Sequence, residues 1–200
     1  MLGEQTSTKK LLTNSMKFMA GEVSKHVEVL KHLEAKKYDN LLPSEADMQY
    51  LYICAMRKEG LNHPDNKYLL GLVEKRPALF TIYGKAMMSV ILARNGNVKL
   101  AKEHLESLKQ YTVYTDEMGR YFDTKSASYS WFDYRIPTEV AAIEAIKMVT
   151  PEDKKTISEM QRWLLQSKRT QSWDTPINAV NAIYAFMQGQ TKESLTNYGA

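Results

Sequence analysis

Two stretches in the second half of the sequence repeat one pattern, and this internal repeat limits the fold more than any other feature. One runs from Trp131 to Met148 and the other from Trp163 to Met187; each combines an aromatic turn, a proline at the opening of a helix and an Ala/Ile-rich helix. The aligned apolar pairs are Val140 and Val180, Ala142 and Ala182, Ile143 and Ile183, and Ala145 and Ala185. A recurring unit of about 40 residues is typical of stacked helical hairpins, because one hairpin cannot bury its apolar face alone.

Helical spacing also dominates the rest of the chain. Apolar residues recur every three or four positions, and Ser44 followed by Asp47 is typical of a capping box, as is Thr150 followed by Asp153. We therefore predict an all-α fold of about eight helices in antiparallel pairs. The expected helices cover about 6–36, 44–58, 65–75, 77–93 and 98–111, and then begin at Pro137, Pro151 and Pro176.

Residues 112–136 interrupt this pattern. They have no helical period, and their aromatic and β-branched side chains are typical of an irregular loop or a hairpin. We expect this aromatic segment to be inserted in one helical domain that spans residues 1–190. The polar residues 191–200 are expected to fray.

Composition excludes several kinds of function. The net charge is only +4, and lysines alternate with acids along the expected helices, whereas nucleic-acid-binding proteins gather basic residues into a stripe. Cys54 is the single cysteine, so an internal disulfide is impossible. His26 and His32 share helix faces with Glu22 and Glu28, but no metal-binding spacing accompanies them. We expect no metal, no cofactor and no membrane-spanning segment.

Short motifs in residues 80–187 resemble the thioester-containing domain of the alpha-2-macroglobulin and complement family. The stretch from Trp163 through Trp173-Asp-Thr-Pro to Ile183 resembles the end of that domain. Pro137–Ala141 looks like its Glu-Thr-Ala helix opening, and Ala93–Asn97 is similar to its alanine-rich helix junction. Terpenoid cyclases and protein prenyltransferases have related folds.

The resemblance implies an α/α toroid, which is a ring of helical hairpins. A complete ring has about six hairpins, and this chain matches about four of them, a partial ring. The expected function is that of a non-catalytic domain in a bacterial macroglobulin-like protein of the periplasm or cell surface, with the cytoplasm as the alternative location. Its expected partners are sibling domains of the same protein, and the family adds protease trapping, with a protease as partner.

The chain departs from the family at the thioester. The family motif is Cys-Gly-Glu-Gln, whereas this sequence has Leu2-Gly3-Glu4-Gln5, and the segment lies too near Trp173 for the intervening family domain. We interpret the match as a coincidence. Leucine cannot form a thioester, so the chain is expected to incorporate no amine at a glutamine.

Four aromatic residues form the candidate binding surface: Tyr121, Tyr129, Trp131 and Tyr134. Such rings stack on sugars or anchor protein partners. The alternative is that they fill the cap of the helical core. A carbohydrate-active toroid with acids such as Asp116 and Asp123 near these aromatics is a competing function, and a peptide-binding repeat scaffold is a third.

A partial ring is also expected to leave apolar faces uncovered. The candidates are Leu12, Met16, Met19 and Val23 on the first helix, or Ile183 and Phe186 on the last. Such a face favours self-association, and we expect a weak homodimer.

Overall fold

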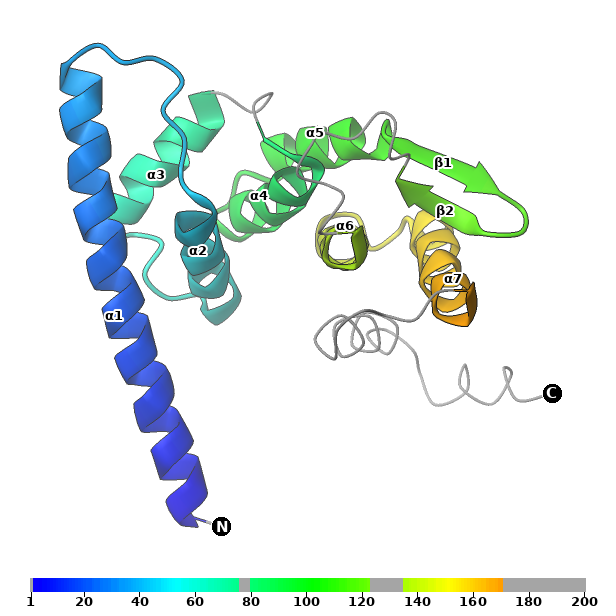
Figure 1. Ribbon diagram of the computed structural model, residues 1–200, viewed down its shortest axis with the longest axis horizontal. Coiled ribbons are helices and arrows are strands. Elements are labelled where there is room, and N and C mark those ends of the chain that lie inside the picture. The colour runs from blue at the N-terminus through cyan, green and yellow to red at the C-terminus, as the bar shows by residue number, and fades with distance from the viewer. Residues whose placement is uncertain (1, 76–79, 123–134, 171–200) are drawn as a thin grey trace. The chain divides into compact units, whose positions relative to one another are not determined.

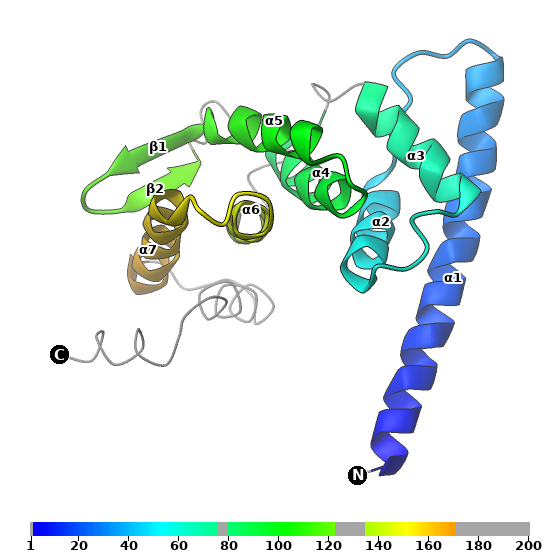
Figure 2. The same ribbon diagram turned by 180° about the vertical axis from the view of Figure 1, so that it is seen from behind.

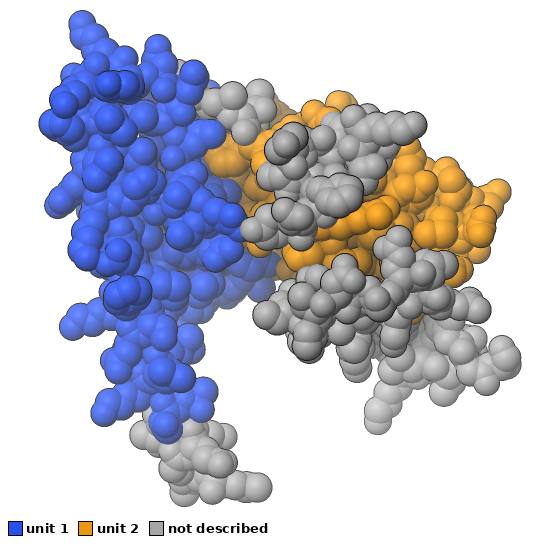
Figure 3. All heavy atoms as spheres, in the orientation of Figure 1, with its two compact units in different colours: residues 1–79 blue, residues 80–200 orange. Residues whose placement is uncertain are grey.

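The computed structural model describes residues 2–75, 80–122 and 135–170 (Figure 1). These residues form seven α-helices and one two-stranded hairpin, so the predicted, mainly helical fold is confirmed. The chain divides into two compact units, residues 1–79 and 80–200, which Figure 3 colours separately. The single domain over 1–190 and the ring arrangement stay predictions, and the helix expected at Pro176 and the tail 191–200 lie outside the described residues.

Unit 1 consists of three helices: α1 (Leu2–Ala35), α2 (Glu45–Arg57) and α3 (Pro64–Lys75). The C-terminal half of α1 contacts α2 and α3, because its buried residues Val23, Val27 and Leu30 recur at helical spacing on one face. The N-terminal half of α1 continues beyond both of the other helices of this unit (Figure 1). The core of the unit is completed by fully buried Leu51, Leu69 and Val73.

The predicted capping box at the start of α2 is confirmed. The Ser44 hydroxyl accepts the backbone N–H of Asp47, and the Asp47 carboxylate accepts the backbone N–H of Ser44 at 2.7 Å. The same carboxylate oxygen lies 2.5 Å from Nδ1 of His26 on α1. Through these two contacts the buried Asp47 carboxylate links the start of α2 to α1.

Replacing Asp47 with alanine is expected to destabilise unit 1 by about 1–2 kcal/mol, because α2 loses its reciprocal cap and His26 loses its acceptor. Chemical denaturation followed by far-ultraviolet circular dichroism measures the effect. Gln49→Ala, at an exposed position of the same helix, is the matched control and should change stability by less than about 0.5 kcal/mol. Equal losses in the two variants would contradict a structural role for the cap.

Unit 2 contains four helices: α4 (Ile82–Arg94), α5 (Val98–Lys109), α6 (Arg135–Val149) and α7 (Lys154–Thr170). Helix α4 contacts α5 and α6, and α6 contacts α7. The turn Asn95–Asn97 joins α4 and α5 into an antiparallel hairpin, as the sequence predicts. Fully buried side chains from all four helices form the core: Ile91, Leu105, Ile143, Ile146, Met160 and Leu164.

Three helix starts differ from the prediction. Helix α4 begins only after Thr81, whose hydroxyl accepts the backbone N–H of Gly84 at 3.0 Å. Helix α6 begins at Arg135, ahead of Pro137. Helix α7 is capped by Asp153, which accepts the N–H of Thr156 at 3.2 Å, and not by Thr150. The Thr150 hydroxyl instead donates to the Ile146 carbonyl at the end of α6.

The segment after α5 forms the hairpin that the sequence allowed. Strands β1 (Thr112–Thr115) and β2 (Gly119–Phe122) pair antiparallel, with Thr112 opposite Phe122. Strand β2 contacts α7, which lies beside the hairpin in both views (Figures 1 and 2). Arg120 donates to the Glu159 carboxylate at 2.7 Å, and Phe122 is buried. The rest of the predicted insertion, 123–134, lies outside the described residues.

Candidate functional site

Only one of the four aromatic residues predicted to form a binding surface lies in the described structure. Tyr121 is on β2, and its ring stacks on Trp163 of α7 with the centroids 6.1 Å apart. Trp163 itself is buried, and Tyr121 is partly exposed beside it. Tyr129, Trp131 and Tyr134 lie outside the described residues, and a binding role for them stays a prediction.

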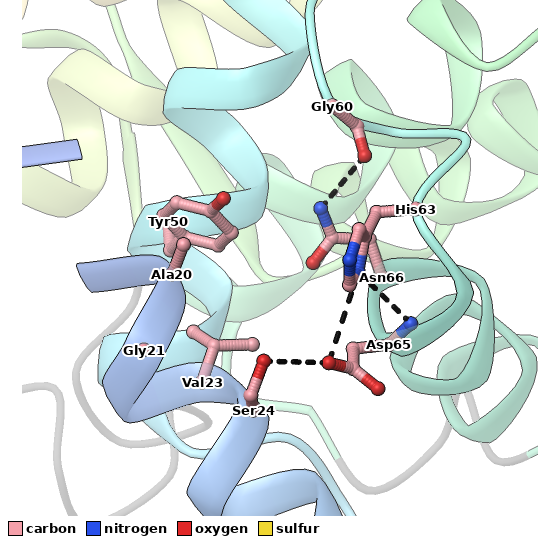
Figure 4. A pocket seen from close by; sticks show the side chains of 9 residues that line it. All are labelled: Ala20, Gly21, Val23, Ser24, Tyr50, Gly60, His63, Asp65 and Asn66. Atoms are coloured by element: carbon pink, nitrogen blue, oxygen red, sulfur yellow. Dashed lines mark hydrogen bonds and ion pairs between the residues drawn. The ribbon is translucent and has the colours of Figure 1, made fainter. Parts of the chain in front are cut away.

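A pocket in unit 1 brings together polar side chains that the sequence did not single out as a site (Figure 4). It has a volume of about 230 Å³ and lies between α1, the start of α3 and the connection that precedes α3. Tyr50 of α2 contributes its ring to the wall. The lining residues are Ala20, Gly21, Val23, Ser24, Tyr50, Gly60, His63, Asp65 and Asn66.

Asp65 is the polar centre of the pocket. Its Oδ2 atom accepts the Ser24 hydroxyl at 2.6 Å and lies 3.7 Å from Nδ1 of His63. Its Oδ1 atom lies 3.8 Å from Nζ of Lys31, outside hydrogen-bonding distance. The Asp65 side chain is only 18% exposed, and its Oδ2 atom is the one directed toward Ser24 and His63 (Figure 4).

Two further polar residues line this pocket. Asn66 is buried and donates through Nδ2 to the Gly60 carbonyl at 2.9 Å, which holds the connection against α3. Burial and the nearby Cys54 thiol raise the pKa of the Tyr50 hydroxyl above its usual value, although Asn66 acts in the opposite direction. Tyr50 is therefore a neutral hydroxyl at physiological pH.

Gly21 opens the α1 side of the pocket. A Cβ atom at this position would meet nothing within 4 Å, and the backbone is in an ordinary helical conformation. Glycine inside a helix costs about 1 kcal/mol relative to alanine, and neither packing nor a turn requires it here. Its effect on the structure is to leave space beside Ser24.

Ser24, His63 and Asp65 are the residue types of a hydrolytic triad, but their order in space is different. In a triad the histidine touches the serine and the carboxylate orients the histidine. Here the carboxylate lies between the other two, and Nδ1 of His63 accepts the backbone N–H of Asp65 at 3.3 Å. This arrangement does not activate Ser24 as a nucleophile. Within the described residues, no three His, Cys, Asp or Glu side chains gather as a metal site.

A second feature of unit 1 is an apolar face on the N-terminal half of α1. Leu12 is 44% exposed, Met16 and Met19 are partly exposed, and all three continue the buried line of Val23 and Val27. The predicted apolar stripe is therefore present at its first three residues. The expectation was wrong for Val23, because α2 and α3 already cover this part of α1. Leu11 and Phe18 add further exposed apolar surface on a neighbouring side of the helix.

Unit 2 contains buried ionisable groups. Glu139 on α6 is fully buried, and burial raises the pKa of its carboxyl well above the usual value, although the Phe122 backbone and Arg135 favour the charged form. No donor among the described residues reaches hydrogen-bonding geometry with either carboxylate oxygen. Burial, together with Lys85, lowers the pKa of His104. In both side chains, burial favours the neutral form over the charged form. Both therefore make the stability of unit 2 depend on pH.

Comparisons with family models, curated proteins and solved structures give no match. No helix in the described part of the chain combines the length and apolar character needed to cross a membrane.

Proposed function

We propose that the chain is a non-catalytic helical module of a larger, exported macroglobulin-like protein, in which it packs against sibling domains as part of an α/α toroid. The observation that carries this proposal is the apolar face formed by Leu12, Met16 and Met19. It continues the core face of α1 past the point where α2 and α3 end. Protease trapping belongs, in this proposal, to the whole protein.

The positions of the family-like motifs support the proposal. Ala93–Asn97 spans the turn of the α4–α5 hairpin, as a helix junction should. Pro137–Ala141 lies in the first half of α6, and Trp163 is buried on α7. Helix α4 packs against α5, its partner in the hairpin, and against α6, the next helix along the chain, as a helix in a stack of hairpins does.

The energetics of the apolar face favour a protein partner. Fully burying an exposed leucine or methionine side chain contributes about 1.5–3 kcal/mol, and each of these partly exposed side chains contributes a fraction of that when it is covered. Three such residues on consecutive helical turns form a line that another helix can match by ridges-into-grooves packing. A sibling domain meets this line at high effective concentration, so even a small contact would stay formed.

Methionine oxidation tests this proposal without a mutation. In the 200-residue chain, peroxide should oxidise Met16 and Met19 readily, because both are partly exposed. In a longer protein that includes the flanking segments of the gene, both should react at least about tenfold more slowly, because a neighbouring domain covers them. Mass spectrometry of tryptic peptides gives the rate at each methionine.

The chain supplies its own controls. Met56 is 42% exposed on α2 and should react readily in both proteins, whereas fully buried Met88 should react slowly in both. If flanking segments leave the rates at Met16 and Met19 unchanged, no sibling domain packs on this face. Light scattering of the short chain and of Met19→Lys then shows whether a second copy covers it.

A further inference from the structure

We propose that the N-terminal half of α1 binds an anionic phospholipid surface and lies in the plane of the headgroups, with Leu11 and Phe18 reaching toward the acyl chains. These two residues lie on a different side of α1 from Leu12, Met16 and Met19, the line that carries the proposed packing function. The two proposals use different sides of the helix and can therefore fail independently.

Two apolar side chains project from this half of α1. Leu11 and Phe18 are 68% and 70% exposed, more than any other large apolar side chain among the described residues. They are seven positions apart, about two helical turns, so they share one face of the helix. The small polar residues Asn14 and Ser15 lie between them in sequence. This half of α1 continues beyond α2 and α3 (Figure 1), so neither of these helices covers the two apolar side chains.

The same half of α1 is basic. Residues 5–21 contain Lys9, Lys10 and Lys17 but no aspartate or glutamate, so this stretch carries a formal charge of +3. All three lysines are exposed. Among the described residues, the first ion pair along α1 begins only at Glu22. The charge complements a surface of anionic lipid headgroups, which attracts clustered lysines.

The lysines are placed as in a helix that lies at a membrane interface. Lys10 directly precedes Leu11, and Lys17 directly precedes Phe18, so each lysine lies about 100° round the helix from its apolar neighbour. From this flank a lysine can lay its alkyl stem along the apolar surface while its ammonium reaches a phosphate group. The two Lys–apolar pairs therefore form successive contacts of the same kind along one side of α1.

Charge and shape together favour lipid over a protein on this side of α1. A second copy of the chain would bring two stretches of charge +3 together, and like charges repel. An acidic protein would match the charge, but it would also need a groove complementary to Leu11 and Phe18. A fluid bilayer adapts to a projecting helix, and binding in the headgroup plane needs no membrane-spanning segment.

Co-sedimentation of the full chain with sucrose-loaded vesicles tests the proposal. Vesicles of phosphatidylglycerol and phosphatidylcholine in equal parts should bind the chain at least about tenfold more strongly than vesicles of phosphatidylcholine alone. Raising the salt from about 0.01 M to about 1 M should remove most of this difference. Soluble polyglutamate, which has the charge but no acyl phase, should bind at least about tenfold more weakly than the mixed vesicles. Equal or tighter binding of polyglutamate would identify an acidic protein as the partner and contradict the proposal.

A pair of variants tests the apolar contact. Phe18→Ser should weaken binding to the mixed vesicles by at least about tenfold, because the ring no longer enters the acyl boundary. Tyr38→Ser, which removes a ring that is 60% exposed outside this stretch, should bind as the wild type does. Both positions are exposed, so the fold is retained, and far-ultraviolet circular dichroism checks this.

A second pair tests the charge. Lys10→Gln combined with Lys17→Gln should weaken vesicle binding by at least about tenfold and reduce its dependence on salt. Lys99→Gln combined with Lys102→Gln changes the net charge equally at exposed positions of α5 and should leave binding unchanged. Equal losses in the two double variants, equal binding to neutral vesicles, or no binding to the mixed vesicles would overturn the proposal.

Discussion

Replacing Gly119 with alanine is expected to destabilise unit 2 by about 3–5 kcal/mol, because the start of β2 passes too close to α7 for any side chain. A Cβ atom here would overlap the Glu159 carbonyl oxygen and would lie 3.1 Å from Cβ of Arg162. The φ angle of +82° is a second obstacle, since a left-handed conformation costs a residue other than glycine about 1–2 kcal/mol. The strand can accommodate the methyl group only by moving away from α7.

Gly96→Ala is a matched control for the backbone conformation. Gly96 also has a positive φ, +91°, but no atom lies within 4 Å of its would-be Cβ. It should therefore lose only about 1–2 kcal/mol, the conformational cost alone. Chemical denaturation of both variants gives the difference, and near-ultraviolet circular dichroism reports the loss of Tyr121–Trp163 stacking in Gly119→Ala. Equal losses would contradict the close approach of β2 to α7.

The helices follow from local patterns, and those patterns predicted them well. The spacing of apolar residues marks α1 over nearly its full length, and the reciprocal bonds of Ser44 and Asp47 depend only on residues three positions apart. Such signals do not need information from elsewhere in the chain. The same holds for the turn Asn95–Asn97 between α4 and α5.

The start of α7 shows where local patterns fail. Thr150 and Asp153 are both acceptable caps by sequence, and the choice between them depends on tertiary contacts. Asp153 pairs with Lys109 of α5 at 2.7 Å, while Thr150 completes the end of α6. Neither contact has a signature in the sequence, because Lys109 is distant along the chain.

The pocket could not be predicted for the same reason. Ser24 and Asp65 meet because α1 and α3 lie side by side, and no motif joins residues with this separation. Gly21 lies inside a helical pattern of apolar residues, and only the structure shows the space beside it. Periodicity likewise identified the face shared by Leu12 and Val23, but it does not say where α2 and α3 stop covering that face.

The second large effect is expected at Glu139, which should make unit 2 less stable as the pH rises. Burial raises the pKa of this carboxyl well above its usual value of 4.5 in the folded chain. Between pH 4.5 and the higher pKa of the folded chain, folding takes up a proton. The contribution of Glu139 to stability is therefore fully present below pH 4.5 and is lost as the pH rises to that higher pKa. The loss is at most about 1.4 kcal/mol per pH unit for one group.

His104 changes stability in the opposite direction. Desolvation by burial, with Lys85 nearby, lowers the pKa of its imidazole below 6.5, so its contribution is present above that pH and is lost as the pH falls. The wild-type profile therefore combines two opposing slopes. Comparing variants, rather than reading the wild-type curve alone, separates them.

Glu139→Gln should remove the Glu139 slope and make unit 2 more stable than wild type at pH 7, because the amide needs no proton to remain neutral. His104→Gln is the matched control: it should flatten the acid side of the profile and leave the Glu139 slope in place. Denaturation midpoints from pH 4.5 to pH 8 measure both variants. A Glu139→Gln protein that is less stable than wild type at pH 8 would mean that the carboxylate is charged and paired in the folded chain. The difference in stability between wild type and Glu139→Gln across this pH range thus reports directly on whether α6 buries a neutral acid.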